Sequence, residues 1–452
     1  MRGSRKPGPA ARRRILDWLD QRTNFERVAP ASAPGRTFGL AGVRRLLADV
    51  GAPQERFPAV HVAGTKGKGS TVAMLAAILQ AAGHRTGRYM SPHVHAIEER
   101  ICVDGRPIGA ADFVAAFDAV IPAVEALDRA AVRRGRRGPT WFEVVTAAAF
   151  VHFARAGVDI AVLETGLGGR LDATNVCRPE VSVITSISLD HMALLGPTVA
   201  RIAAEKAGII KRGCPVVSGA VHPAARRVIE ATARRRRAPL LQLGRDFHAV
   251  PAAEGRRPAG VIVGFPDGSR HCYRVGMAGR HQADNAALAA VTARELDGRG
   301  LPVPERAIAA GIASVRLPAR IETVSRAPLV IVDAAHNVAS MEALIETLSD
   351  ELRPGRPRAL LFAVSRDKQV EQMLAAAADR FDHVIVTRYA TNPRAADVDR
   401  LVAACRLARL PRPTVAASPA AALRTARTLV GRGGVIVVAG SFFLAAEIEA
   451  RG

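Results

Sequence analysis

The sequence predicts an α/β protein with mostly parallel sheets, divided into two domains. Short runs rich in β-branched residues alternate with longer Ala- and Leu-rich helical patterns through most of the 452 residues. That length exceeds one typical domain and leaves room for a substantial core. A helical pattern ends near Ser314, and Leu317-Pro318 precedes a new series of strands, so we place the domain boundary near Arg316.

Individual strands are expected where short apolar runs precede helical patterns. In the first domain these runs lie at 59–62, 159–163, 181–184 and 215–217, and in the second at 329–332, 359–362, 383–386 and 434–438. Between about 240 and 275 the pattern changes to short strands with turn signals such as Pro266-Asp-Gly, which predicts antiparallel strands attached to the first domain. A helix is expected from about Gln282.

The charge balance indicates an anionic partner. Lysine and arginine total 64 against 41 acidic residues, a formal net charge of +23. Nucleic acid and small phosphorylated or polycarboxylate molecules both suit such an excess. Aromatic residues make up only 4%, which argues against base-stacking platforms. We interpret the arginine runs 133–137 and 234–237 as solvated loops or helix faces, and we expect no nucleic-acid partner.

The cysteine content and the hydropathy of the chain indicate the cellular environment in which we expect this protein. No CxxC pair occurs among the five widely spaced cysteines, Cys102, Cys177, Cys214, Cys272 and Cys405. Neither a zinc site nor a disulfide framework is therefore predicted. The basic N-terminus lacks an apolar signal region, and the apolar stretches 144–154 and 435–446 are too short to span a bilayer. We expect a soluble, cytoplasmic protein with no membrane partner.

A glycine-rich turn between an expected strand and an expected helix is the strongest chemical signal. It reads Gly64-Thr65-Lys66-Gly67-Lys68-Gly69-Ser70-Thr71. Glycines let backbone N–H groups approach phosphate oxygens, and the helix N-terminus adds positive potential. The spacing is shorter than the Walker A form and a glycine precedes Ser70, yet Lys68 and a hydroxyl stand at the required turn. We predict nucleotide binding there.

A second glycine-rich turn follows the strand expected at 159–163. It contains Gly166, Gly168 and Gly169, but the third glycine of the dinucleotide fingerprint is missing. We therefore reject an NAD-binding interpretation.

Charged and imidazole side chains follow two expected strands. Glu164 ends one apolar run, and Asp190-His191 follow the next. The carboxyl ends of parallel strands meet at one sheet edge, where a Mg²⁺ ligand beside a phosphate loop belongs. Each residue alone could be an ordinary turn residue, but together they predict a metal site. Ser91 and Lys206 add a hydroxyl and an amine of less obvious purpose.

These motifs, in this order, resemble the folylpolyglutamate synthase and dihydrofolate synthase family of the Mur ligase superfamily, and the resemblance covers nearly the whole chain. The strings that carry it lie at 64–71, 91–93 (Ser-Pro-His), 98–101 (Glu-Glu-Arg-Ile), 140–143 (Thr-Trp-Phe-Glu), 163–175, 184–191, 203–211, 281–285, 333–337 (Asp-Ala-Ala-His-Asn) and 440–444 (Gly-Ser-Phe-Phe-Leu).

The resemblance implies an ATP-dependent ligase that forms an acyl phosphate and then an amide with L-glutamate. It implies a P-loop ATPase domain with a mostly parallel sheet over 1–316 and a smaller Rossmann-like α/β domain over 317–452. ATP contacts are expected from Gly64, Thr65, Gly67, Lys68, Gly69, Ser70, Asn285, Arg320 and Asp333. The two domains would then both contact the nucleotide.

The resemblance also implies roles at the metal, folate and catalytic positions. Mg²⁺ would be held by Ser70, Ser91, Glu164, His191 and a carbamylated Lys206. The alternative for Lys206 is an unmodified lysine that touches phosphate. Folate contacts are expected from Phe38, Gly39, Leu40, Thr140, Trp141, Phe142 and Glu143, and catalytic roles from Lys68, Lys206 and His336. Residues 140–143 also fit a helix start, with Thr140 as N-cap and Glu143 as its capping-box partner.

Departures from the family pattern are small. Ala334 replaces the commoner glycine, so the backbone there cannot need a glycine-only conformation unless the turn has shifted. The arginine-rich stretch 129–138 and the region of Asp367-Lys368 leave local contacts open.

We expect a monomer that adds glutamate both to dihydropteroate and to the γ-carboxylate of reduced folates. A monofunctional folylpolyglutamate synthase is the main alternative. A Mur-type ligase for another substrate would share the phosphate loop, but normally has a separate UDP-binding domain before it. A nucleic-acid-stimulated P-loop ATPase is suggested by charge alone. A non-catalytic binding protein is disfavoured because Lys68, Glu164 and His191 are all present.

Overall fold

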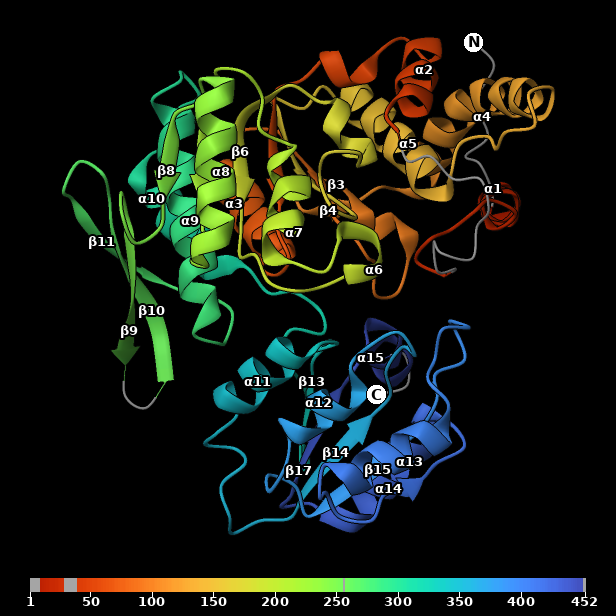
Figure 1. Cartoon of the computed structure of the whole chain (residues 1–452), viewed down its shortest axis with the longest axis vertical. Helices are drawn as coiled ribbons and strands as arrows, with labels where there is room; N and C mark the ends of the chain where they lie inside the picture. Colours follow the sequence, from red (N-terminus) through yellow and green to blue (C-terminus); the bar gives the residue numbers. More distant parts are fainter. Residues whose placement is uncertain (1–8, 28–38, 255–256, 450–452) are drawn as a thin grey trace. The chain divides into compact units, whose positions relative to one another are not determined.

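The computed structural model describes residues 9–27, 39–254 and 257–449, which form two compact units (Figure 1). Within those residues, unit 1 extends to Val275 and resumes over Ala283–Val315. Unit 2 comprises Gly276–Gln282 and the residues from Arg316 onward. The short segment Gly276–Gln282 thus groups with the second unit, although the sequence places it before the expected boundary.

The main sheet of unit 1 has the parallel centre that the sequence predicts. Its strands are β1 (Ala59–Ala63), β2 (Thr86–Tyr89), β3 (Ile101–Val103), β4 (Arg106–Pro107), β5 (Ile160–Glu164), β6 (Pro179–Ile184), β7 (Val216–Ser218) and β8 (Leu240–Gln242). In the described residues their order is β4-β3-β2-β5-β1-β6-β7-β8. Pairing is parallel from β2 to β8, and β3 and β4 add an antiparallel edge. β1 and β5 are buried along their whole length, as continuous apolar runs of a covered parallel sheet should be.

Helices connect and cover these strands (Figure 1). They are α1 (Pro9–Asp20), α2 (Ala41–Asp49), α3 (Lys68–Ala81), α4 (Ala110–Val132), α5 (Trp141–Ala156), α6 (Met192–Leu195), α7 (Val199–Ala207), α8 (Pro223–Arg236), α9 (His281–Asp297) and α10 (Glu305–Ser314), with short 3₁₀ turns η2 (Pro53–Glu55), η3 (Ile97–Arg100) and η4 (Ala173–Val176). α10 packs closely on α3, because a Cβ added to Gly311 would lie 2.5 Å from the backbone nitrogen of Ile78. The helix that carries the phosphate loop is therefore braced from outside the sheet.

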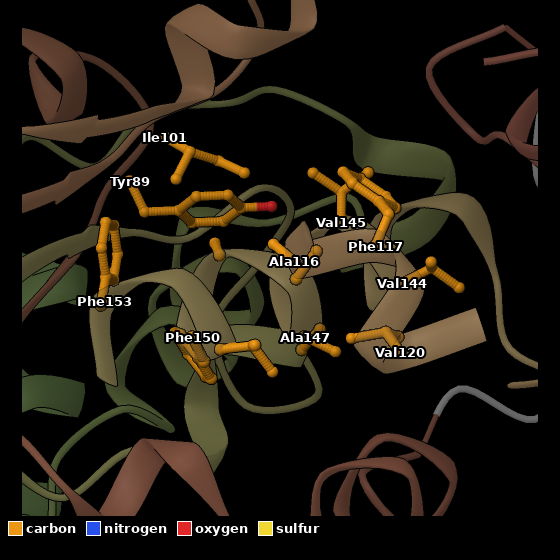
Figure 2. Close-up of a cluster of buried hydrophobic side chains, with 14 of the residues drawn as sticks. Tyr89, Ile101, Ala116, Phe117, Val120, Val144, Val145, Ala147, Phe150 and Phe153 are labelled. Carbon is orange, nitrogen blue, oxygen red and sulfur yellow. The ribbon is translucent and has the colours of Figure 1, made fainter. Parts of the chain in front are cut away.

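Aromatic and β-branched side chains of α4 and α5 form a large core against the sheet (Figure 2). Tyr89 and Ile101 come from the strands, while Phe117, Phe150 and Phe153 come from the helices, and all five are buried. Phe57 contacts the last two edge-on, with ring centroids 5.9 Å apart in each pair. Each such ring contributes roughly 1.5–3 kcal/mol by leaving water. This core anchors the strand ends that carry the site.

The antiparallel strands predicted for 240–275 are present. β9 (His248–Glu254), β10 (Arg257–Gly264) and β11 (Arg270–Arg274) form a separate sheet of order β11-β10-β9. Tyr273 faces α10 and donates its hydroxyl to Glu305 at 2.6 Å.

Unit 2 is a Rossmann-like α/β domain. Its strands are β12 (Glu322–Arg326), β13 (Leu329–Val332), β14 (Arg358–Phe362), β15 (His383–Val386), β16 (Thr414–Val415) and β17 (Val435–Ala439). Its helices are α11 (Val338–Thr347), α12 (Val370–Ala375), α13 (Val398–Leu407), α14 (Pro419–Val430) and α15 (Phe442–Glu449). The order is β12-β13-β17-β14-β15-β16, with only the β12 pairing antiparallel among the described strands. The predicted fold class is confirmed. No helix in the described ranges is both long and apolar enough to cross a bilayer.

Candidate active site

The phosphate loop leaves β1 at Ala63 and ends where α3 begins, at Lys68. A Cβ on Gly64 would lie 1.7 Å from Oγ1 of Thr185, so no side chain fits there. Gly67 has φ of +83°, and a Cβ there would lie 2.2 Å from Oδ1 of Asn285. Both glycines are therefore required by close approach, and the second also by its left-handed backbone. Asn285, predicted from the resemblance to contact ATP, lies against this loop.

Two lysines converge on one backbone carbonyl in the loop. Lys68 Nζ donates to the Gly64 carbonyl at 3.1 Å, and Lys206 Nζ donates to the same oxygen at 2.7 Å. Lys206 is buried, whereas the Lys68 side chain is 17% exposed. Burial, reinforced by the charge of Lys68, lowers the pKa of Lys206 to about 7. The structure thus places the Lys206 amine at the glycine-rich loop, where a pKa of about 7 leaves a substantial neutral fraction near pH 7.

Glu164, the last residue of β5, supplies the carboxylate of this site. It is buried, and Lys68 Nζ lies 4.0 Å from its Oε1. Its Oε2 accepts a hydrogen bond from the backbone N–H of Ser91 at 3.2 Å. A Cβ on Gly69 would lie 3.7 Å from the same oxygen, which puts the first turn of α3 beside the carboxylate. The predicted grouping of the phosphate loop, Glu164 and the Ser91 loop is therefore present in unit 1.

These residues fit Mg²⁺ better than a softer metal. Among the described residues, no three or more His, Cys, Asp or Glu side chains are grouped closely enough to hold a metal ion. Mg²⁺ commonly takes only one or two carboxylates and completes its shell with phosphate oxygens and water. Glu164 and the hydroxyl-bearing Ser70 and Ser91 match that pattern. The hydroxyls of Thr71 and Thr165, next to Ser70 and Glu164 in sequence, are buried and have no hydrogen-bond partner in the described part of the chain. Both hydroxyls can therefore still form a hydrogen bond beside the carboxylate.

His191 lies farther out than the other expected ligands. It precedes α6 with φ of +49°, and its side chain is 40% exposed. Its Nε2 is 3.9 Å from Oδ2 of Asp190, whose charge acts on Lys206 and favours the protonated amine. The structure therefore connects the Asp190-His191 pair to the site electrostatically, and the ligand role of His191 stays a prediction.

Thr185, which no sequence motif singles out by itself, also belongs to this group of residues. Its Oγ1 donates to the Lys66 carbonyl at 2.6 Å and blocks any side chain at Gly64. The backbone N–H of Thr65 donates to the Ser186 carbonyl at 2.7 Å, which ties the same loop to the end of β6. The only sequence signal was its position, one residue beyond an expected strand and within the 184–191 motif.

The Thr140–Glu143 motif forms the capping box at the start of α5. The N–H of Glu143 donates to Thr140 Oγ1 at 3.3 Å, and Glu143 Oε2 accepts from the Thr140 N–H at 2.8 Å. Trp141 is buried in the core, and Phe142 is half-buried. A Cβ on Gly166 would lie 2.6 Å from Cζ of Phe142, so this ring packs on the turn that follows Glu164. The helix-start interpretation is confirmed, and folate contact stays a prediction.

The other expected folate segment reaches the same region. A Cβ on Gly42 would lie 3.7 Å from Glu143 Oε1, which puts the start of α2 beside the capping box. Leu40, directly before α2, is half-buried and packs against the core, and Gly39 is exposed. Phe38 lies outside the described residues. The structure thus brings 39–42, 140–143 and the turn after β5 together.

The glycines of that turn have structural reasons. A Cβ on Gly169 would lie 2.9 Å from the Glu205 carbonyl and 3.0 Å from Cα of Lys206. Close packing on α7 therefore explains the glycine without a dinucleotide site, and it fixes the backbone that carries Lys206.

Unit 2 contains the remaining expected nucleotide residues. Asp333 is buried at the end of β13, and its carboxylate accepts from the N–H groups of Ile321 at 2.9 Å and Ala335 at 2.7 Å. Burial raises the pKa of Asp333, while the charge of Arg320 opposes the rise. Ala334 is not among the described residues with positive φ, in agreement with the expectation that no glycine is needed there.

Arg320 and His336 gather around one ring of unit 2. The Arg320 guanidinium lies 5.0 Å from the Phe442 ring centroid, and the His336 ring lies 6.1 Å from it. Nδ1 of His336 hydrogen bonds with the Ala334 carbonyl at 2.9 Å. Their roles toward ATP and catalysis stay predictions.

Comparison with known proteins agrees with this site. Residues 125–293 match the Mur ligase middle domain, and residues 319–442 match the Mur ligase glutamate ligase domain. The fold and site thus define an ATP-dependent ligase of the Mur type.

Individual relatives narrow the assignment. The dihydrofolate synthase/folylpolyglutamate synthase of Bacillus subtilis is 40% identical over 74% of this chain and 77% of its own length. The protein of the same name from Mycobacterium tuberculosis is 39% identical over 85% of this chain and 80% of its own. The chain belongs to the folylpolyglutamate synthase and dihydrofolate synthase family.

Solved structures match over nearly the full length. The Mycobacterium tuberculosis folylpolyglutamate synthase complexed with ADP and AMPPCP has a TM-score of 0.86 at 34% identity, covering 98% of each chain. Escherichia coli FolC in complex with DHPP and ADP has a TM-score of 0.81 at 30% identity, covering 96% of this chain and 97% of that one.

Proposed function

We propose that this enzyme joins L-glutamate to dihydropteroate and to the γ-carboxylate of reduced folates, using ATP and an acyl phosphate. The observation that carries the proposal is the convergence of Lys68, Lys206 and Glu164 on the phosphate loop. Relatives named for both activities support the dual assignment.

The chemistry requires two steps. An oxygen of the acceptor carboxylate attacks the γ-phosphorus of ATP, the bond to ADP breaks, and an acyl phosphate forms. The glutamate amine then attacks the acyl carbon, phosphate leaves, and the amine loses a proton. ATP can drive amide formation only if its phosphoryl group reaches the carboxylate first, and a cationic Lys68 stabilises the charge that develops there.

Mg²⁺ would be held by Glu164 with Ser70, Ser91 and His191, and when bound it supplies charge neutralisation for the phosphates. Without it, the loop holds two amines near one carbonyl; the carboxylate of Glu164 lies 4.0 Å from Lys68, and the charge of Asp190 acts on Lys206 without preventing the lowering of its pKa.

Carbamylation of Lys206 resolves that imbalance. The neutral amine adds to CO₂, a nitrogen–carbon bond forms, and the nitrogen releases a proton. A buried lysine whose pKa lies near 7 has the neutral amine that this addition needs. The product carries negative oxygens beside Lys68, in place of a second positive charge, and those oxygens suit Mg²⁺.

Release of ADP with each acceptor tested separately decides the substrate. We expect turnover with dihydropteroate and with tetrahydrofolate, each dependent on L-glutamate. Turnover with tetrahydrofolate alone would leave a monofunctional folylpolyglutamate synthase, the name of a Lacticaseibacillus casei relative that is 37% identical. Nucleic-acid-stimulated hydrolysis without a folate would overturn both assignments.

Isotope transfer tests the intermediate. With ¹⁸O in the acceptor carboxylate, one labelled oxygen should appear in the released phosphate. Unlabelled phosphate would exclude the acyl phosphate. We also predict a monomer, which light scattering after size-exclusion chromatography would check.

A further inference from the structure

A buried arginine organises the loop that follows Ser91, and the proposed reaction does not use it. Arg100 is 1% exposed. Its Nη1 and Nη2 donate to the two carboxylate oxygens of Glu26 at 2.8 and 2.6 Å, and its Nε donates to Nδ1 of His93 at 2.7 Å. A buried guanidinium that is held by both oxygens of a carboxylate has one orientation. Its Nε–H donor therefore fixes the orientation of the His93 imidazole.

Two further contacts hold the surroundings of that imidazole. The Arg100 guanidinium lies 4.7 Å from the ring centroid of Trp141, at the start of α5. The carboxylate of Glu99 accepts from three successive backbone N–H groups after His93, those of residues 94, 95 and 96, at 2.8 to 2.9 Å. The loop therefore contacts Glu164 through the backbone of Ser91 and is connected to the start of α5 through Arg100.

His93 consequently presents a fixed donor. Because Nδ1 accepts a hydrogen bond from Arg100, the proton of the neutral imidazole is on Nε2. His93 is half-buried. Its Nε2 has no hydrogen-bond partner among the described residues, where Nδ1 alone is engaged, by Arg100. An oriented N–H donor two residues from Ser91 is available to a ligand.

We propose that His93 is a substrate contact for the glutamyl part of reduced folates, with Arg100 and Glu26 as its positioning residues. The inference rests on the proposed function. Either acceptor must bring its reacting carboxylate to the Glu164 edge. In dihydropteroate the atoms directly behind that carboxylate are an aromatic ring, which accepts no ordinary hydrogen bond. In a reduced folate they include an α-carboxylate and an amide carbonyl, which do.

The test compares the two acceptors in His93→Ala. We expect KM for tetrahydrofolate to rise about tenfold, the loss of one hydrogen bond to a charged or carbonyl oxygen, with kcat and the KM for dihydropteroate nearly unchanged. His93→Gln, which keeps a neutral N–H donor, should restore most of the affinity. His95→Ala, a histidine change in the same loop, is the matched control. If the parent enzyme does not turn over dihydropteroate, the inhibition constant of dihydropteroate, measured with tetrahydrofolate as the substrate, replaces the KM for dihydropteroate.

An equal loss of affinity for both acceptors, or no loss for either, would overturn the proposal. Failure of the parent enzyme to release ADP with any folate would instead overturn the proposed function, so the two failures are distinguishable.

A double-mutant cycle tests the positioning role. Arg100→Lys keeps the charge but cannot bond Glu26 and His93 together. We expect it to raise KM for tetrahydrofolate selectively, and the double variant with His93→Ala to be no worse than the poorer single variant. Urea unfolding would show whether a variant has lost its fold. Glu26→Gln, which weakens the interaction that orients Arg100, is a second variant that tests the same positioning role. Additive effects would show independent roles and contradict the proposal.

Discussion

The role of Lys68 can be tested by Lys68→Met, which keeps a long apolar stem and removes the charge. The Lys68 ammonium lies 3.1 Å from the Gly64 carbonyl and 4.0 Å from Glu164, with the side chain 17% exposed. Removing one preorganised donor from developing charge costs about 3–4 kcal/mol in the transition state, or about 10²–10³ in kcat. We therefore expect ligation to fall by roughly that factor.

Stability should change far less than activity. The attraction to Glu164 at 4.0 Å is lost, but so is the repulsion between Lys68 and Lys206, and the two changes oppose each other. We expect the free energy of unfolding to change by about 1 kcal/mol or less.

ADP release at saturating ATP and acceptor, together with urea unfolding, measures both quantities. Arg212→Met removes an exposed cation of the same unit and is the matched control. Activity of Lys68→Met within severalfold of the parent would refute the assignment of this lysine to the phosphates. If the activation free energy of ligation and the free energy of unfolding changed by equal amounts, the charge would support the structure of the loop rather than the reaction.

Three other changes test the site. Gly64→Ala should abolish ATP binding, measured by calorimetry, because its Cβ would lie 1.7 Å from Thr185 Oγ1. Gly109→Ala, whose Cβ would have its nearest atom 3.9 Å away, is the control and should bind ATP normally. Normal ATP binding by Gly64→Ala would mean that the loop relaxes freely. Thr140→Ala should lower the free energy of unfolding by about 1 kcal/mol through loss of the N-cap, with Thr140→Ser as control; a raised KM for folate without lost stability would favour substrate contact instead. The carbamate at Lys206 can be followed by ¹³C NMR with labelled bicarbonate. The carbamylated fraction should decline as pH falls through about 7, because protonation removes the nucleophilic amine. An unchanged carbamylated fraction from about pH 8 to about pH 6 would contradict the lowered pKa of Lys206.

The local elements of this protein can be predicted from neighbouring residues alone. The strand, glycine-rich turn and helix around 64–71 could be predicted because apolar period and turn chemistry are properties of neighbouring residues. The carboxylate at Glu164 could be placed for the same reason, since it directly follows a buried strand. The capping box of α5 is likewise visible in four consecutive letters, and the structure has it.

Contacts between side chains that are distant in sequence depend on how the whole chain folds. Lys206 had no clear purpose from its own segment, yet α7 brings its amine to the Gly64 carbonyl. Asn285 reaches Gly67, and Glu26 reaches Arg100, across long stretches of chain. Hydrophobic period specifies a strand and its buried face, but strand order and helix packing determine the partners across the sheet. The pKa of Lys206 belongs to the same category, because burial and a neighbouring charge exist only after the chain has folded.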